Sequence, residues 1–157
     1  MINVINNFTD NEKFNNILNN IKNNFPWYAE PNTNIFKHIL IKTNHLNQKE
    51  TSPFAKNLCD PLLEKLQDKN IKNLIINFAV PLKKVKNNAF KVVDPEDSSY
   101  IGILFLNSND GFMQIYNQEK IKNEENRFVV FSKNTPYYQS IPTDLPNIFL
   151  EVEYEDN

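Results

Sequence analysis

The chain has 157 residues, which is enough for one domain with a substantial core and too few for two domains of ordinary size. Its formal net charge is -2, so no overall positive charge draws it toward nucleic acid or an anionic membrane. These bounds exclude binding to nucleic acid through general electrostatics, and they favour a single globular domain.

Cysteine usage and the lack of long apolar runs bear on the compartment. Cys59 is the one cysteine, so no disulfide can form within the chain and a reducing compartment is expected. No run approaches the roughly 20 apolar residues of a membrane span, and the first residues lack the basic-then-apolar order of a signal peptide. We therefore predict a cytoplasmic protein without membrane contact, in which Cys59 is a small buried side chain.

Two compositional features stand out. Asparagine supplies 28 of the 157 residues, a bias that is typical of coding in an AT-rich genome and says nothing about mechanism. Arg127 is the only arginine. Because guanidinium is the preferred bidentate partner of carboxylates and phosphates, such a ligand would have to be held by lysine, hydroxyl or backbone groups.

The first part of the chain predicts a strand, a helix and a second strand. Residues 1–8 alternate apolar and polar side chains, as a short strand does. Thr9-Asp10 supplies a helix N-cap, and apolar residues recur at helical spacing over Asp10–Asn23. The aromatic segment Phe25–Tyr28 ends the helix, since proline disfavours helix in the preceding residue, and we expect it to pack against a sheet. A strand is predicted over Ile35–Ile41.

A second helix and a series of strands follow. Ser52 as cap and Pro53 at the first helical position predict a helix to about Asp68, kinked or split at Pro61. Apolar β-rich runs then alternate with turn residues. The expected strands are 71–80, 89–93, 100–106, 112–116, 127–131, 137–138 and 148–154.

The order of these elements indicates the fold class. Asp110-Gly111, between two of the expected strands, is a hairpin signal. Helices come first and many antiparallel strands come after them. This order predicts an α+β domain dominated by a sandwich or jelly roll.

Histidines and charged loops offer no recognised metal site. His38 and His45 are the only histidines, and their spacing of seven is not a known ligand spacing, so we expect hydrogen-bonded or surface roles. The lysines of 83–86 predict a solvated basic turn, because no aromatic residues interleave with them. The carboxylates of 94–97 suit Ca²⁺ chemically but lack the glycine and spacing of a dedicated loop, which favours a solvated acidic turn.

Several segments also carry a resemblance to a known family. They are Phe25–Tyr28, Ile71–Leu74, Phe90, Leu106–Gly111, Asn126–Phe131 and Asn134–Pro136. In order and spacing they resemble small phage-type members of the iron(II) and 2-oxoglutarate dependent oxygenases, the prolyl-hydroxylase-like branch, over roughly residues 25–154. The resemblance implies a double-stranded β-helix, or jelly roll, with N-terminal helices packed on one sheet. It also implies one domain over 1–157, with its barrel core at about 71–155 after a helical and stranded part at about 1–70.

The same resemblance implies a site. Family members hold iron through a His-x-Asp pair and a distal histidine, with open positions for 2-oxoglutarate and oxygen. These positions fall at Lys91, Val93 and Tyr137 here, and the basic residue that grips 2-oxoglutarate falls near Asn147. None of the four carries the expected group, although a register error of one residue would place Asp94 at the aspartate position. We therefore expect no catalytic residues, no metal and no cofactor, and regard the four positions as remnants of a pocket.

These substitutions lead to a primary hypothesis and an alternative. The primary one is a non-catalytic β-helix protein, phage-encoded, that acts as a structural or protein-interaction component in the host cytoplasm or the virion. The alternative is an active hydroxylase with an atypical site that uses Fe(II) and 2-oxoglutarate, or other chemistry based on Lys91, Tyr137 and Tyr138. A protein partner or self-assembly through strand edges is expected, and nucleic acid and membrane are not.

Overall fold

The computed structural model describes residues 2–22, 24–44, 46–82, 98–116 and 118–156. The strand expected at 89–93 and the charged turns at 83–86 and 94–97 lie outside these residues. The helices are α1 (Asn11–Lys22) and α2 (Ala55–Lys65). The strands are β1 (Ile2–Ile5), β2 (Tyr28–Ala29), β3 (Ile35–Thr43), β4 (Lys49–Thr51), β5 (Lys69–Ala79), β6 (Tyr100–Phe105), β7 (Phe112–Ile115), β8 (Lys120–Lys122), β9 (Phe128–Ser132), β10 (Tyr137–Gln139) and β11 (Asn147–Asp156).

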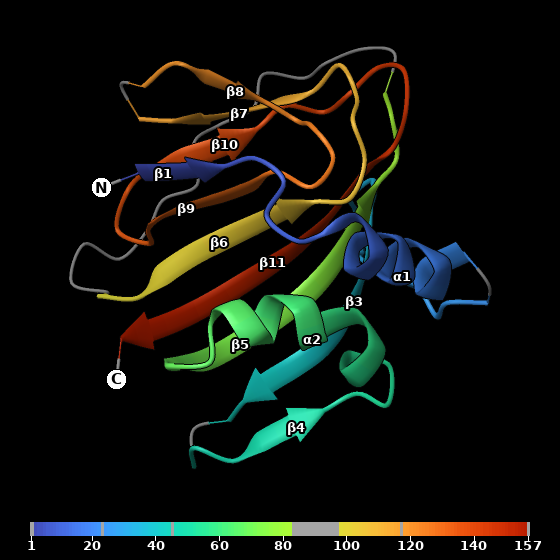
Figure 1. Cartoon of the computed structure of the whole chain (residues 1–157). Helices are drawn as coiled ribbons and strands as arrows, with labels where there is room; N and C mark the ends of the chain where they lie inside the picture. Colours follow the sequence, from blue (N-terminus) through green and yellow to red (C-terminus); the bar gives the residue numbers. More distant parts are fainter. Residues whose placement is uncertain (1, 23, 45, 83–97, 117, 157) are drawn as a thin grey trace.

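The described strands form two antiparallel sheets (Figure 1). The large sheet has the order β1-β9-β6-β11-β5-β3-β2, with β4 also paired to β3, and the small sheet has the order β10-β7-β8. In the large sheet β1 neighbours β9 and β6 neighbours β11, so several neighbouring strands are distant in sequence, as in a double-stranded β-helix. The predicted α+β jelly roll with N-terminal helices is confirmed.

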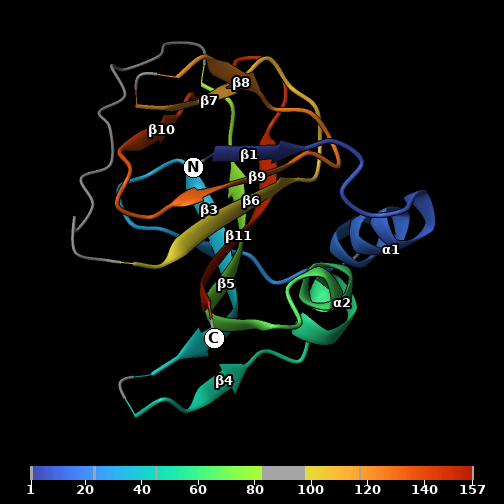
Figure 2. The same ribbon diagram turned by 60° about the vertical axis from the view of Figure 1, so that its left-hand side comes forward.

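One hydrophobic core lies between the helices and the outer face of the large sheet, and Figure 2 shows the two helices side by side next to that sheet. Ile17 of α1 and Leu62 of α2 are fully buried there. They share the cluster with Leu74 of β5 and Leu150 of β11, whose side chains alternate with those on the other face. The apolar periodicity of both helices therefore buries against the sheet.

A second core lies between the two sheets. It joins Ile101, Ile103 and Phe105 of β6, Val129 and Phe131 of β9, Met113 and Ile115 of β7, Tyr137 of β10 and Phe149 of β11. Most of these side chains have no exposed surface. This part of the space between the sheets is therefore packed with side chains.

Most predicted elements of the N-terminal half are confirmed, with small shifts at their ends. The Asp10 carboxylate caps α1 by accepting a hydrogen bond from the Lys13 backbone N–H at 2.9 Å. The Phe25 and Trp27 rings pack edge to face at 4.9 Å, as expected for a core aromatic segment.

No helix in the part of the chain that the structure describes is long and apolar enough to cross a membrane.

The predicted start of the second helix was wrong. α2 begins at Ala55 with Phe54 as its N-cap, and no side chain caps it. Ser52 instead accepts the Ala55 N–H through its backbone oxygen at 3.0 Å, so Ser52-Pro53 forms a turn before the helix. Pro61 lies inside α2, which continues through it as one helix.

The hairpin predicted at Asp110-Gly111 was also wrong, because β6 belongs to the large sheet and β7 to the small one. The turn exists, but the chain crosses there from one sheet to the other. The Asn109 side-chain oxygen accepts the Gly111 N–H at 2.8 Å, and Gly111 does not have the positive φ of a primed hairpin turn. The division of the domain near residue 70 stays a prediction.

Candidate functional site

Tyr137, the expected position of the distal metal-binding histidine, belongs to the core between the sheets. It begins β10 and pairs with Ile115 of β7. Its side chain is 2% exposed, and its ring packs against Phe131 with centroids 4.7 Å apart and an edge-on geometry. A buried phenol among aliphatic and aromatic side chains contributes packing at this position, whereas an imidazole would supply a metal ligand.

Asn147, the expected position of the group that binds 2-oxoglutarate, is 1% exposed at the first residue of β11. Its Oδ1 accepts a hydrogen bond from Asn109 Nδ2 at 3.3 Å, and its Nδ2 donates to Gln139 Oε1 at 3.4 Å. The amide therefore links the β6–β7 connection to β10. It carries no charge with which to pair a carboxylate.

The face of the large sheet that carries Phe149 and looks toward the small sheet also carries polar side chains. Glu151 and Glu153 lie at alternate positions of β11 after Phe149, so they share its face. Glu153 accepts hydrogen bonds from Lys133 Nζ at 2.6 Å and from Asn73 Nδ2 at 3.1 Å. The charge of Glu153 is thus balanced within the protein.

His38 lies on the face of the large sheet that packs against the helices, and both nitrogens of its ring have hydrogen-bond partners. Its ring is 7% exposed among the aromatic side chains of Phe25 and Phe54. Nδ1–H donates to the Pro26 carbonyl at 2.9 Å, and Nε2 lies 2.8 Å from Ser52 Oγ. The prediction of a hydrogen-bonded histidine is confirmed for His38.

The arrangement of potential metal ligands bears on whether this protein holds an ion. Within the described ranges, no three His, Cys, Asp or Glu side chains lie close enough together to hold an ion. Cys59 is buried without exposed surface, and burial raises the pKa of its thiol well above the usual range, so it is an inert core side chain as predicted. Lys91, Val93 and Asp94 lie outside the described residues. The described positions Tyr137 and Asn147 do not offer the imidazole and the cation that the resemblance assigns to them.

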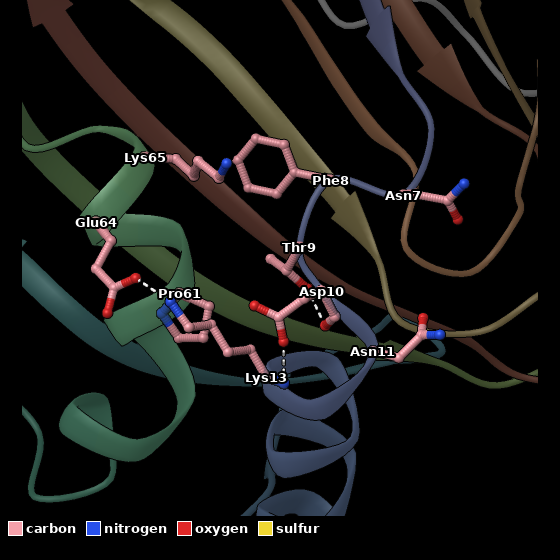
Figure 3. Close-up of a pocket in the computed structure, with 9 residues that line it drawn as sticks. All are labelled: Asn7, Phe8, Thr9, Asp10, Asn11, Lys13, Pro61, Glu64 and Lys65. Carbon is pink, nitrogen blue, oxygen red and sulfur yellow. Dashed lines mark hydrogen bonds and ion pairs between the residues drawn. The ribbon is translucent and has the colours of Figure 1, made fainter.

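A groove of about 770 Å³ lies between the start of α1 and α2 (Figure 3). Phe8, Asp10 and Lys13 contribute from the α1 side, and Pro61 and Glu64 contribute from α2. Lys13 Nζ pairs with Glu64 at 2.5 Å, and this carboxylate raises the pKa of Lys13. Asp10 caps the helix, Lys13 pairs with Glu64, and Lys65 also lines the groove, which is therefore a polar and charged surface.

Sequence reasoning did not identify this groove. Its central ion pair joins residues 51 positions apart, and only the packing of α1 on α2 brings them together. Neither residue type nor local spacing signals such a contact. The Asn109–Asn147 contact was missed for the same reason, although Asn147 itself was singled out.

Comparison with solved structures places this architecture among known folds. A 2OG-Fe(II) oxygenase family oxidoreductase from Burkholderia pseudomallei matches with a TM-score of 0.72 at 10% identity, over 98% of this chain and 84% of that one. The viral collagen prolyl hydroxylase of Paramecium bursaria Chlorella virus 1, solved with 2-oxoglutarate, matches with a TM-score of 0.66 at 12% identity, over 99% and 96%. HygX from Streptomyces hygroscopicus, solved with nickel and 2-oxoglutarate, gives 0.65 at 7% identity, over 99% and 83%. No family model and no curated protein matches the chain in sequence.

These matches confirm the resemblance at the level of the fold. They also correct one expectation. The prediction that no cofactor is involved is contradicted, because solved proteins of this fold hold 2-oxoglutarate, with nickel in one of them. The substitutions at Tyr137 and Asn147 describe individual side chains, and they do not justify a general statement about cofactors.

Proposed function

We propose that this protein uses the oxygenase fold as a structural or protein-interaction component and does not catalyse an oxygenase reaction. The observation that carries the proposal is the burial of Tyr137 in the apolar core between the sheets, in contact with Phe131. A side chain at the centre of a packed core is held by its neighbours and has no room to approach a substrate.

The chemistry of the other positions supports the same proposal. Lysine is protonated at neutral pH and is a poor ligand for Fe(II), and valine has no donor atom, so the residue types of Lys91 and Val93 do not replace a His-x-Asp pair. The side-chain amide of Asn147 forms hydrogen bonds with Asn109 and Gln139. The side chains that would create the reaction site of this fold therefore serve packing or internal hydrogen bonding where they are described.

The proposal includes a viral, phage-encoded origin, with the protein in the host cytoplasm or the virion. One support is the phage-type resemblance of the segments around Asn126–Phe131, and another is the high asparagine content, which is typical of coding in an AT-rich genome. A third is the size of the chain, which covers 96% of the chlorella virus hydroxylase. Mass spectrometry of purified virions from a strain that encodes the chain would detect the protein if it is a virion component. Its absence from virions and from infected cells would refute this part.

The catalytic part of the proposal is tested by turnover of 2-oxoglutarate. The wild-type protein is incubated with Fe(II), ascorbate and 2-oxoglutarate, and succinate is followed by NMR, with the chlorella virus hydroxylase as positive control under the same conditions. We expect succinate at the level of the protein-free control. Formation above that level, lost in Lys91→Ala or Tyr137→Ala protein that remains folded, would overturn the proposal.

A further inference from the structure

The first strand leaves an uncharged edge at one end of the large sheet. Among the strands that the structure describes, β1 pairs with β9 alone and ends the strand order. None of the backbone hydrogen bonds among the described residues engages its other edge. Alternate residues of an antiparallel edge strand direct their N–H and C=O groups away from the sheet, so β1 presents a row of donors and acceptors that no described residue engages.

The other described edges are protected by charge or by shortness. β4 reads Lys49-Glu50-Thr51, and β8 carries Lys120 and Lys122. β2 has only two residues and is followed by Glu30, which pairs with Lys37 at 2.7 Å. Charged side chains on an edge strand oppose pairing with another strand. β1 reads Ile-Asn-Val-Ile and carries no charge. β10, which ends the order of the small sheet, is also uncharged, but it has three residues and its Tyr137 is buried.

The side chains of β1 are also available for contact. Val4 is 42% exposed and Ile5 is 37% exposed, although both are apolar and lie within a strand. Val4 is opposite Val129 of β9, which belongs to the core between the two sheets, so Val4 lies on the face of the large sheet that looks toward the small sheet. Ile5 is opposite Phe128, which belongs to the core under the helices, so Ile5 lies on the other face. A strand added at this edge would cover apolar surface on both faces.

We propose that β1 pairs antiparallel with β1 of a second copy of this chain about a two-fold axis, which joins the two large sheets. Residues opposite each other in such a pair share a face, which an axis at Asn3 and an axis at Val4 both satisfy. We assign the axis at Val4, with Val4 opposite Val4 of the second copy and Asn3 opposite Ile5, because this register sets the exposed apolar Val4 against itself. This inference rests on the proposed interaction role and names its partner.

The chemistry of the edge favours a second copy as the occupant. An uncharged strand neither repels its own copy nor requires an oppositely charged partner, and a two-fold satisfies both edges at once. The register also buries the exposed Val4 against itself. Since four residues form a short interface, we expect a weak dimer with a Kd on the order of micromolar.

The test uses the full chain and two cysteine variants. Val4→Cys places two thiols opposite each other, where Cα separations of about 4.5 to 5.5 Å admit a disulfide. Leu145→Cys is the matched control, because Leu145 is an exposed leucine, at 52%, outside the strands. The buried native Cys59 does not interfere. Under mild oxidation we expect the Val4→Cys dimer to form at least tenfold faster than the Leu145→Cys dimer, and equal rates would overturn the proposal.

Sedimentation velocity supplies the second measurement. We expect the wild type to shift from 18.4 kDa toward twice that mass as concentration rises from about 1 to 100 µM. Val4→Lys, which sets two charges against each other at the axis, should stay monomeric, and Leu145→Lys should behave as the wild type. If Val4→Lys does not fold, which its circular dichroism would show, the rates of disulfide formation in Val4→Cys and Leu145→Cys decide the test. A monomeric wild type overturns the dimer without affecting the turnover result, and succinate formation by a dimer overturns only the proposed function.

Discussion

Replacing Tyr137 by alanine separates a core role from a role in an open site. The side chain is 2% exposed and packs edge-on against Phe131 at 4.7 Å, so truncation removes a buried ring and leaves a cavity. Large-to-small changes at buried aromatic positions cost about 3 to 5 kcal/mol. We therefore predict a loss of about 4 kcal/mol in the free energy of unfolding, a large share of the roughly 5 to 15 kcal/mol of a typical domain.

Urea unfolding followed by circular dichroism measures this loss, with Tyr138→Ala as the matched control. Tyr138 is half-buried, contacts Phe112 at 5.8 Å and donates a hydrogen bond to Gln114 at 3.0 Å, so its removal should cost about 1 to 2 kcal/mol. A cost below about 1 kcal/mol for Tyr137→Ala, with an unchanged m-value, would show that the ring does not pack in a core and would refute the reasoning.

Three further predictions concern other parts of the fold. Gly102→Ala should lower the free energy of unfolding by about 1 to 3 kcal/mol in the same urea assay, because the added Cβ would meet the Phe128 ring; a neutral effect would contradict that packing. Hydrogen bonds from Thr143 lower the pKa of Asp110 to about 2, below about 3.9 for an unfolded chain, so Asp110 adds stability that is fully present above pH 4 and is lost as pH falls toward 2. Thermal unfolding between pH 5 and 2 should therefore show a smaller loss of Tm in Asp110→Asn than in the wild type, and parallel curves would count against it. The Cys59 thiol should react with a chromogenic disulfide reagent at pH 8 only after unfolding, and fast labelling of the native protein would show that the thiol is accessible.

Local signals predicted much of the fold. The apolar period of α1, its Asp10 cap and the alternation along β5 and β11 all come from interactions within a few residues. These features were read correctly because local geometry alone determines them. The jelly-roll class followed from the order of the elements.

Features that depend on tertiary packing could not be read in this way. Asp110-Gly111 carries a hairpin signal, yet the Asn109 side chain takes the Gly111 N–H and the chain crosses to the other sheet. Ser52-Pro53 has the chemistry of a helix start, but Ser52 instead contacts His38 and closes a turn. In both cases a side chain used elsewhere in the fold decides the local structure.

The candidate site shows the same division. The resemblance singled out Tyr137 and Asn147, and the structure shows that each is almost completely buried. The resemblance did not show what these two residues contact, because Phe131 and Asn109 approach them only once the two sheets have assembled. Residue type predicted which groups are missing from these positions, and packing determines what the present groups do.

The packing of Tyr137 can be tested most directly by a crystal structure grown with Mn(II) and 2-oxoglutarate. We predict that the Tyr137 ring remains packed against Phe131 in this crystal, as it is without these additives. An interior opened around 2-oxoglutarate and a metal ion beside residue 137, with the tyrosine displaced, would contradict the proposal that this position serves packing rather than oxygenase chemistry.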